Sequence, residues 1–541
     1  MGDFHPPKVL HGLNIGSVMT FIPVLDATQA ASWDEVARDV ADIPSRVLME
    51  SAGRATALIL SREFESELSS GVLVIAGHGN NGGDGWVVAR ALHSVGVLTY
   101  AVDEDRNRTE DCEANRKLAL DAGVLRVEPD GEWPNCGVAV DALLGTGASG
   151  RPRGTIGAMA ERLMELGVPV VAIDGPTGLD LSSGKAEGPV QADLTVTFGG
   201  ARRGHLVERS WCGKIVVVEM GFSPPDPTWP KLVEDRWAAE FLPPFFEEMH
   251  KGNRGRVLVV GGDKGMAGAA IFAAQTAFAA GAGLVKIAAH DASIAVAQET
   301  LPDALTVTTA LGPDLEPDLE QALDWADTVV LGPGLGRGEA RTPFVRAILE
   351  RIEKSAVIDA DGLQVGLEVL STGNAARVFT PHPGEFTTLF SDLENDLRID
   401  RFAAAGIAAY DAHAANAAAS PASPSPPVVL LKGVPTVIAQ EGSPSRIVAS
   451  GNPALATGGS GDLLAGFIGA FLAQGLKPLD AAALGAQVLG RSAEIASAAK
   501  TARATRPGDV AEAAQEYWRI LANLPAPAPP ILIELDAPRL V

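Results

Sequence analysis

Short apolar, β-rich runs that end in glycine-rich turns alternate with helix-length segments along this chain, and this alternation limits the fold more than any other feature. In the first half the runs are GVLVIAG, GVAVDALLG and VPVVAIDG, separated by segments such as WVVARALHSVG and IGAMAERLMELG. A second series begins at RVLVVGG and continues through TVVLGPG, AVIDADG and VVLLKG. Strands that alternate with helices form parallel sheets whose faces the helices cover. The chain is therefore predicted to be α/β, with two three-layer αβα domains in tandem.

The 541 residues exceed what one ordinary core organises, and a proline-rich stretch separates the two series. Residues 222–246 contain two Pro-Pro pairs, which interrupt periodic structure. We therefore predict a first domain at residues 22–224, a short linker at 225–228, a second domain at 229–522 and a tail at 523–541.

Three segments stand apart from this framework. Residues 403–427 and 524–530 are low in complexity and rich in Ala and Pro, so we interpret both as surface loops or linkers, with a helix in the Ala-rich half of the first. Residues 265–285 carry no charge, but they are mostly Ala and Gly and include Gln275 and Thr276. We predict a buried helix there rather than a membrane span.

The charge balance restricts the partners. Lys and Arg number 43 against 67 Asp and Glu, which gives a formal net charge of -24. A surface of this sign does not suit the phosphate backbone of nucleic acids or an anionic membrane, so we expect neither partner. The three cysteines form no CxxC pair, and the first residues do not resemble a secretion signal. We expect a cytoplasmic protein.

The turn GHGNNGGDG follows the first strand-like run and precedes a helix-length segment. Glycine permits positive φ and a close backbone approach, so successive N–H groups and the helix start can face an anion. A plain tight turn is the alternative. Asn80, Asn81 and Asp84 favour a ligand site, because they add oxygen atoms that a turn alone does not need.

Two further loops follow strand-like runs in the same half. Asp141 ends one run and precedes a glycine-rich loop with Arg151 and Arg153, which suits a cation at the carboxylate and a phosphate at the loop. Asp174 ends another run, three residues before the hydroxyl of Thr177. Each aspartate alone also fits a helix cap or a turn. Ligands of open α/β sheets bind at the carboxyl ends of the strands, so the three loops are predicted to converge on one site.

The first half resembles the NAD(P)H-hydrate epimerase family through LMESAG, GNNGGDG, DALLGTG with the following RP, and DGPTGLD, over about residues 24–224. The resemblance implies a Rossmann-like domain in which Asp174 contacts the reacting ring and is the candidate for acid/base work. The residues implied to bind the substrate's phosphates are Asn80, Asn81, Gly82, Gly83, Asp84, Gly145, Thr146, Gly147 and Arg151. The residues implied to hold a potassium ion are Asn81, Asp141 and Thr177. The family usually has Asp-Ile-Pro-Ser-Gly where this chain has DGPTG, in which the threonine keeps the hydroxyl and the second residue loosens the loop.

The second half also places distinctive loops after strand-like runs. Residues 250–270 and 329–338 are glycine-rich and suit a ligand that approaches the backbone, although the first also fits simple packing. His382 lies between two prolines, either in a rigid exposed turn or as a substrate contact beside Glu385. Residues 428–439, VVLLKGVPTVIA, fit a hairpin that covers a nucleotide or a plain hairpin.

The motif ATGGSGDLLAG points most directly to chemistry. Gly458, Gly459 and Gly461 precede Asp462, which is predicted to begin an apolar helix. The N–H groups at that helix start would stabilise negative charge on a transferring phosphoryl group, and Asp462 would accept a hydroxyl proton. The alternative role of Asp462, an ordinary N-cap, needs no run of glycines before it.

These segments resemble the ribokinase-like superfamily and, within it, the ADP-dependent NAD(P)H-hydrate dehydratase family, through HKGNRG, GGDKGMAGA, GPGLG, DADGL, TPHPGEF, KGVPT and ATGGSGDLLAG, over about residues 229–522. The resemblance implies a mostly parallel sheet, Asp462 as the base, and magnesium with the nucleotide phosphates. The residues implied to contact the hydrated dinucleotide are Ala269, Gly334 and His382. The residues implied to contact the nucleotide are Lys432, Gly433, Val434, Pro435, Thr436 and Gly461. Pro-Ala-Leu at 453–455 replaces the family's common Pro-Gly-Met.

Together, the two halves resemble the bifunctional NAD(P)H-hydrate repair family. The resemblance implies that the first domain interconverts the R and S hydrates of NADH and NADPH (NADHX and NADPHX). The second would dehydrate the S form with ADP, or alternatively ATP, and release AMP and phosphate. A homo-oligomer is implied as well. The alternative is a ribokinase-like kinase of a vitamin or sugar joined to a non-catalytic nucleotide-binding module, because the GGSGD loop alone fits any ribokinase-like phosphotransferase.

Overall fold

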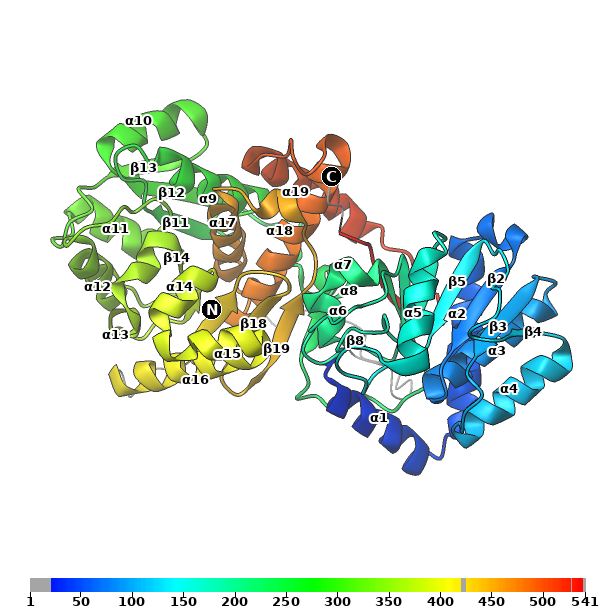
Figure 1. Cartoon of the computed structure of the whole chain (residues 1–541). Coiled ribbons are helices and arrows are strands. Elements are labelled where there is room, and N and C mark those ends of the chain that lie inside the picture. Colours follow the sequence, from blue (N-terminus) through cyan, green and yellow to red (C-terminus); the bar gives the residue numbers. More distant parts are fainter. Residues whose placement is uncertain (1–20, 420–424, 527, 539–541) are drawn as a thin grey trace.

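The computed structural model describes residues 21–419, 425–526 and 528–538. Two αβα units lie side by side, one built on an eight-stranded sheet and the other on a ten-stranded sheet (Figure 1). The predicted α/β class with two three-layer units is confirmed. The expectation that the chain begins without a secretion signal concerns residues outside the described part of the chain.

The first sheet has the strand order β20-β9-β7-β6-β5-β2-β3-β4, and all pairs are parallel except β20 with β9. Along the chain its strands are β2 (Val72–Ala76), β3 (Thr99–Asp103), β4 (Leu125–Val127), β5 (Val138–Ala142), β6 (Val170–Ile173), β7 (Leu194–Phe198), β9 (Lys214–Val218) and β20 (Ile531–Leu535). The strand order reverses direction between β2 and β5. A crevice therefore opens at the carboxyl ends of these two strands, which is where open α/β sheets bind ligands.

Alternating side chains of the strands separate the helices of the first unit onto two faces. Val72 and Val74 of β2 pack with helices α2, α3 and α4, whereas Leu73 and Ile75 pack with α5. The helices of this unit are α1 (Ala27–Asp39), α2 (Ser45–Glu63), α3 (Asn80–Ser94), α4 (Glu110–Ala122), α5 (Gly154–Glu165), α6 (Arg203–Val207) and α7 (Arg209–Cys212). The fully buried strands explain the unbroken apolar runs in the sequence.

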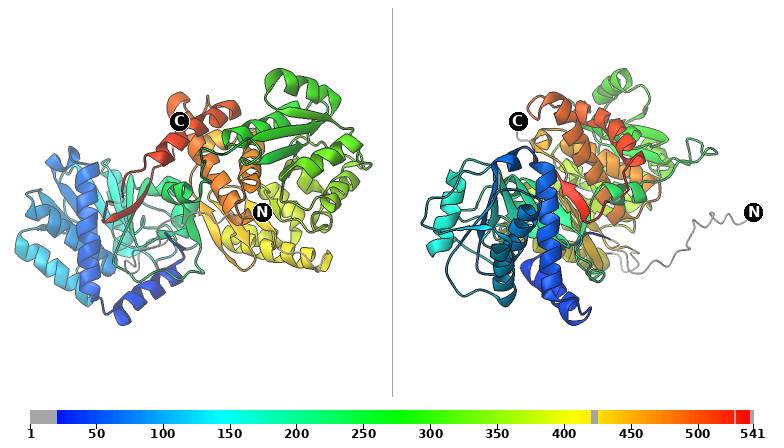
Figure 2. Two further views of the ribbon diagram at one scale, coloured as in Figure 1. Left: turned by 180° about the vertical axis from the view of Figure 1, so that it is seen from behind. Right: turned by 90° about the vertical axis from the view of Figure 1, so that its right-hand side faces the viewer.

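The end of the chain differs from the tail that the sequence predicts. Residues Ile531–Leu535 return to the first unit as strand β20 and pair antiparallel with β9 (Figure 2). The strand ILIEL covers the edge that β9 would otherwise expose, which removes an unpaired row of backbone groups. The proline-rich segment before it was interpreted as a linker, and it connects helix α19 (Pro507–Ala522) to this strand.

The second sheet has the order β10-β19-β18-β17-β16-β15-β14-β11-β12-β13 and is parallel except where β18 pairs with β17 and β19. Its strands are β10 (Lys231–Val233), β11 (Arg256–Val260), β12 (Leu284–Ala289), β13 (Leu305–Thr308), β14 (Thr328–Leu331), β15 (Ala356–Ile358), β16 (Arg377–Phe379), β17 (Val428–Leu431), β18 (Thr436–Gln440) and β19 (Ser443–Val448). The prediction of a mostly parallel sheet with a hairpin at β17 and β18 is confirmed.

Two layers of helices cover this sheet. One face carries α9 (Ala267–Ala279), α17 (Ser460–Ala473), α18 (Pro478–Lys500) and α19. The opposite face carries α11 (Pro317–Trp325), α12 (Arg341–Arg351), α14 (Pro383–Leu389) and α16 (Arg401–Ala419). The shorter helices are α8 (Asp235–Phe241), α10 (Asp291–Thr300), α13 (Leu367–Leu370) and α15 (Glu394–Ile399). Among the described residues, none of the helices combines the length and the apolar character needed to cross a membrane.

Helix α16 corrects one interpretation made from the sequence. Its Ala-rich residues were expected to be helical, which is confirmed, but also to be a surface addition, which is wrong. Ala404, Ala405, Ala408 and Ala412 are buried against the sheet, and the helix forms the crossover between β16 and β17. Small side chains let the helix approach the strands closely, so the low complexity reflects packing. Residues 420–424 of the predicted insertion lie outside the described part of the chain.

The two units share an apolar core where they meet. Ala201, Leu206 and Val217 of the first unit belong to the same buried cluster as Leu232 and Leu258 of the second. The short strands β1 (Val24–Leu25) and β8 (Ala201–Arg202) pair with each other beside this cluster. Apolar burial of this kind holds the two units in a fixed arrangement.

Candidate active sites

A cavity of about 640 Å³ opens in the first unit at the carboxyl ends of β2, β5 and β6. The loops after these three strands, predicted to converge, all line it. The predicted site residues that line it are Asn80, Asn81, Asp84, Gly145, Thr146, Gly147 and Asp174. Gly82, Gly83 and Arg151 are absent from its lining. Asp141 and Thr177 lie buried behind the loops that form its wall.

The glycines after β2 bring α3 close to the sheet. A side chain at Gly82 would place its Cβ 1.9 Å from the carbonyl oxygen of Gly77, and one at Gly85 would lie 2.5 Å from Ala142. Packing therefore requires these glycines. Gly79 has free space around it, and the N-terminus of α3 with Asn80 faces the cavity. The N–H groups of that helix start are available to an anion.

Asp174 lies directly after β6 with φ 65°, a backbone conformation that aspartate adopts more readily than most residues. Its Oδ2 accepts hydrogen bonds of 2.5 Å from both the amide and the hydroxyl of Thr146, and its Oδ1 lies 3.3 Å from the Arg202 guanidinium. Burial alone would raise the pKa of Asp174, but Arg202 and the Thr146 hydrogen bonds outweigh burial and lower it. Asp174 is thus held as a carboxylate.

Asp141 and Thr177 form a buried pair beneath the same loops. The Thr177 hydroxyl donates to Asp141 Oδ1 at 2.8 Å, and the Thr177 amide donates to Oδ2 at 2.8 Å. Burial raises the pKa of Asp141 to about 6. Asn81, the third residue of the predicted cation site, has both side-chain polar atoms buried, and neither finds a hydrogen-bond partner among the residues that the structure describes. An orphaned amide oxygen, together with the carboxylate and hydroxyl oxygens of the predicted set, fits a hard cation that takes oxygen ligands.

Two charged residues of this site, Arg202 and Asp34, were not predicted from the sequence, and both lie near the predicted Asp84. Arg202 follows β7 through a glycine turn and reaches Asp174 from a different loop. Asp34 of α1 and Asp84 of α3 line the cavity, and burial together with the neighbouring carboxylates raises the pKa of both. The motif GGARRG after an apolar run was the available signal for Arg202, whereas no signal in the sequence marked Asp34.

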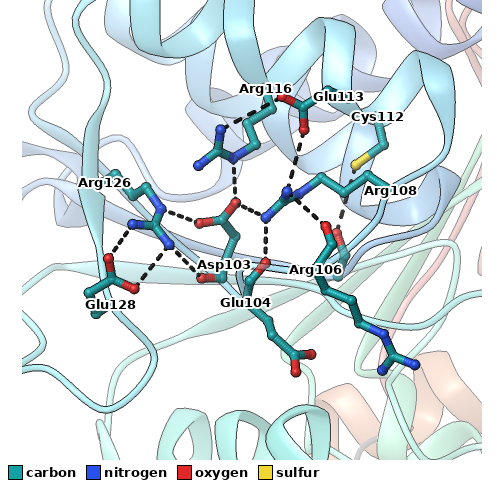
Figure 3. Close-up of polar contacts among 10 residues, drawn as sticks. Asp103, Glu104, Arg106, Arg108, Cys112, Glu113, Arg116, Arg126 and Glu128 are labelled. Carbon is teal, nitrogen blue, oxygen red and sulfur yellow. Dashed lines mark hydrogen bonds and ion pairs between the residues drawn. The ribbon is translucent and has the colours of Figure 1, made fainter.

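A third strand-end carboxylate, Asp103 at the end of β3, is already neutralised by the protein. Figure 3 shows it between three guanidinium groups that lie 2.5–2.6 Å from its oxygens. The three residues are Arg108, Arg116 and Arg126. Only 1% of the Asp103 side chain is exposed, so its role is to tie β3, α4 and β4 together rather than to bind a ligand.

In the second unit, charged side chains gather at the carboxyl ends of β15 and β17. The Lys432 ammonium lies 2.5 Å from Asp359 Oδ1, which also accepts a 2.8 Å hydrogen bond from the Thr380 hydroxyl. Asp359 Oδ2 is buried and has no hydrogen-bond partner in the described part of the chain. Gly461 lies against both Lys432 and Asp359, since a Cβ there would be 3.0 Å from the ammonium and 3.3 Å from Oδ2. In the sequence, Asp359 stands out only as part of the string DADGL.

Asp462 is the third residue of α17 and faces this cluster. The helix begins at Ser460, after Gly459 with φ 102°, so Asp462 is not the N-cap and the N-cap alternative is wrong. Burial and the nearby carboxylates of Asp359 and Asp361 raise the pKa of Asp462 to about 7, although Lys432 opposes them. A half-buried carboxylate with this pKa beside a helix N-terminus suits general base chemistry near neutral pH.

Two of the three predicted dinucleotide contacts, Gly334 and Ala269, meet near the β11 and β14 loops, whereas His382 lies at the start of α14. Gly334, with φ 59°, packs against Ala269, because a Cβ at Gly334 would lie 3.0 Å from that side chain. His382 is the N-cap of α14, and its Nδ1 accepts a 3.0 Å hydrogen bond from the Gly384 amide. Burial raises the pKa of Glu385, and Lys432 and Asp359 also act on it electrostatically. His382 therefore holds a rigid turn close to that cluster.

A second cavity, of about 590 Å³, lies beside this cluster and is lined by all six residues predicted to contact the nucleotide. They are Lys432, Gly433, Val434, Pro435, Thr436 and Gly461. Among the described residues, no three His, Cys, Asp or Glu side chains converge to hold a metal ion by themselves. A cation in either unit therefore needs backbone, amide, hydroxyl or phosphate oxygens as well.

Comparison with known proteins identifies both units. Residues 257–516 match the family model described as NAD(P)H-hydrate dehydratase, and residues 45–204 match YjeF-related protein N-terminus. A bifunctional NAD(P)H-hydrate repair enzyme of Moorella thermoacetica is 33% identical over 516 residues, covering 90% of this chain and 95% of the relative. The enzyme of the same name from Escherichia coli is 33% identical over 85% of this chain and 87% of its own length.

Among solved structures, an ADP/ATP-dependent NAD(P)H-hydrate dehydratase from Bacillus subtilis, co-crystallised with ATP and Mg²⁺, is 26% identical. It covers 53% of this chain and 97% of its own, with a TM-score of 0.46.

Proposed function

Because this chain belongs to the family of bifunctional NAD(P)H-hydrate repair enzymes, we propose that it repairs hydrated NADH and NADPH in two steps. The first unit epimerises the R and S hydrates, and the second dehydrates the S form to NAD(P)H. The observation that carries this proposal is the 33% identity that runs through both units to relatives that are themselves covered over 95% and 87% of their length. A vitamin or sugar kinase is not favoured, since those relatives are named as repair enzymes from end to end.

In the first unit we propose Asp174 as the residue that moves protons on the hydrated ring. It stays ionised because of Arg202 and Thr146, so it is ready to accept a proton at Oδ1 or Oδ2. The N-terminus of α3 and the loop at Gly145 and Thr146 bind the substrate's phosphates through backbone N–H groups. A side chain at Gly145 would lie 2.9 Å from Asp174 Oδ2, so glycine lets this loop approach the aspartate closely.

We propose that Asn81, Asp141 and Thr177 hold a potassium ion. The unpartnered Asn81 side chain supports this assignment, as does the all-oxygen donor set. When bound, the ion supplies positive charge that favours anionic groups in the cavity. Asp141 and Thr177 contribute independently of it by fixing the loop after β5, because the Leu144 amide donates to the Thr177 hydroxyl at 3.1 Å.

In the second unit we propose that Asp462 removes the proton from the ring hydroxyl. That hydroxyl oxygen then attacks the terminal phosphoryl group of ADP, and AMP leaves. Phosphate, a better leaving group than hydroxide, then leaves while the neighbouring ring carbon loses a proton, and the ring double bond is restored. The N–H groups at the start of α17 stabilise the charge that develops on the transferred group, and Lys432 adds a cation beside them.

Magnesium fits the same place as a companion of the nucleotide. The unpartnered Asp359 Oδ2 is the protein oxygen best placed to hold it, together with phosphate oxygens. Its chemistry there is charge neutralisation on the phosphates. We propose ADP as the donor, with ATP as the alternative.

The compartment and the assembly are also proposals. Cys112, Cys136 and Cys212 are all free, which supports a reducing compartment, and we propose the cytoplasm. We propose a homo-oligomer from the family resemblance, which light scattering coupled to size exclusion tests directly.

The test of the function follows the absorbance of NADH regained from a mixed preparation of R and S hydrates. Potassium, magnesium and either ADP or ATP are supplied in separate arms. We expect full recovery with the parent, recovery of only the S fraction with Asp174→Asn beyond the spontaneous rate, and no recovery with Asp462→Asn. A parent that regains no NADH with either nucleotide would overturn the proposal.

A further inference from the structure

The nucleotide cavity of the second unit is not enclosed by the second unit alone. Its lining includes Val207, Arg209 and Ser210, which belong to helices α6 and α7 of the first unit, and Pro538 near the end of the chain. The nucleotide contacts predicted from the sequence all lie within the second domain. The cavity is therefore a shared one, with a wall that comes from the other side of the junction between the units.

The lining of this cavity suits a nucleotide. Lys432, Ser460 and Gly461 line it at or beside the N-terminus of the 14-residue helix α17, where phosphates are favoured. Apolar side chains line it as well, which suits a base and a ribose. They include Val207, Val434, Pro435, Val448, Leu455 and Leu489. The wall from the first unit thus contributes Val207 to the apolar part of the lining.

Arg209 fixes this wall in place. Its side chain is 6% exposed, and its guanidinium donates to the carbonyl oxygen of Ala449 at 2.5 Å and to the carbonyl oxygen of Asp536. Ala449 itself lines the cavity, and Asp536 lies two residues before Pro538. The Arg209 Nε is buried without a partner among the described residues. One arginine of the first unit therefore ties together two segments that border the nucleotide cavity.

The segment that carries these residues has little freedom to swing away. Leu206 is fully buried in the apolar cluster that both units share, and Val207 packs against the same cluster. Four residues before Leu206, Arg202 pairs with Asp174 of the first active site. The α6–α7 segment is thus anchored at both ends, by the first active site and by Arg209.

We infer that the first unit completes the nucleotide site of the second: Val207 and Ser210 contact the nucleoside, and Arg209 is a positioning residue for that wall. This inference rests on the proposed function, since it takes the cavity to hold ADP or ATP. It predicts that nucleotide affinity depends on residues that the dehydratase half does not contain.

The test introduces a large side chain into the cavity from an exposed position of this wall, in the full-length chain. Ser210 is exposed and its side chain makes no hydrogen bond among the described contacts, so Ser210→Trp leaves the core intact while it occupies the cavity. We expect the Kd of Mg-ADP, measured by calorimetry, to rise at least tenfold. The KM for ADP rises in parallel, and saturating ADP restores the turnover. Ser94→Trp, an exposed serine at the end of α3 that lines neither active-site cavity, is the matched control and leaves the Kd unchanged.

Arg209 is tested by a graded pair of variants. Arg209→Met removes both donated hydrogen bonds, whereas Arg209→Lys retains a cation that reaches one carbonyl, so we expect the KM for ADP to rise more in the first than in the second. Epimerisation in the same samples reports whether the first unit is folded. If the parent binds Mg-ADP and Ser210→Trp binds it equally well, the inference is wrong while the proposed function stands. If the parent binds neither ADP nor ATP, the proposed function fails first.

Discussion

Replacing Asp462 by asparagine is predicted to slow dehydration by a factor of about 10²–10⁴ and, at the same time, to stabilise the second unit. A pKa displaced from 3.8 to about 7 corresponds to a cost of about 4 kcal/mol for keeping the carboxylate charged in the folded state above pH 7. Asp462 keeps part of its surface in water, so we halve this cost to about 2 kcal/mol. Asparagine has the same shape and carries no charge, and it removes that cost.

The sign of the pH dependence follows from the direction of the shift. Below pH 3.8 the carboxyl group is protonated in both the folded and the unfolded chain, and it contributes nothing to the pH dependence. Between pH 3.8 and about 7 the unfolded chain ionises while the folded chain does not, so the parent loses stability progressively. The stability that Asp462→Asn gains over the parent therefore increases with pH through this window and is constant above it. At pH 5 it should be less than half of its value at pH 8.

Differential scanning calorimetry checks this prediction. A gain of about 2 kcal/mol in a unit of this size raises Tm by about 4 °C at pH 8. Asp303→Asn makes the same chemical change at an exposed position of the second unit and serves as the control. Dehydration by Asp462→Asn should fall by a factor of about 10²–10⁴, and the parent's kcat/KM should fall tenfold per pH unit below pH 7. An Asn variant that melts below the parent at pH 8, or gains as much at pH 5 as at pH 8, would refute the reasoning.

Three further perturbations test other parts of the molecule. Asp103→Asn leaves three guanidinium groups without their buried partner and should destabilise the first unit by about 3 kcal/mol, seen as a lower Tm, with epimerisation unchanged at low temperature. Thr177→Val removes the hydroxyl that bonds Asp141, so the potassium concentration for half-maximal epimerisation should rise at least tenfold, whereas Thr177→Ser should behave like the parent. Arg202→Met removes the cation that lowers the pKa of Asp174, so the acid limb of the epimerisation profile should move to higher pH, and Arg202→Lys should restore most of it. An unmoved profile in Arg202→Met would show that the Thr146 hydrogen bonds alone keep the carboxylate ionised.

Strand-end loops were the part of both sites that the sequence could predict. Asp141 and Asp174 directly follow apolar runs, and a parallel sheet places the carboxyl ends of such strands at one edge. The nucleotide-binding set was predictable for a similar reason. Lys432 and Thr436 lie on either side of one tight hairpin, so their proximity is fixed by local chain geometry.

Partners that arrive from distant segments could not be predicted. Nothing in the spacing of Arg202 and Asp174 indicates that their side chains meet, because β7 and its glycine turn lie between them. The alternation in ILIEL is typical of a strand, but only the exposed edge of β9 determines where β20 pairs. The low complexity of α16 was misleading, because its alanines are typical of a surface loop in the sequence but form a packed crossover helix in the structure.

The chemistry of each site is decided by the neighbours of its aspartate rather than by the aspartate itself. Asp174 and Asp462 both sit at the carboxyl edge of a parallel sheet, and burial pushes the pKa of both upward. The pKa values of the two aspartates differ because the nearest cation pairs with the aspartate itself in one site and with a different carboxylate in the other. Arg202 lies 3.3 Å from Asp174 and lowers its pKa, whereas Lys432 lies 2.5 Å from Asp359 and is largely neutralised before it can act on Asp462. One carboxylate is therefore a resident anion, and the other gains and loses a proton near neutral pH, which is the division of labour that an epimerase and a base-catalysed phosphoryl acceptor require.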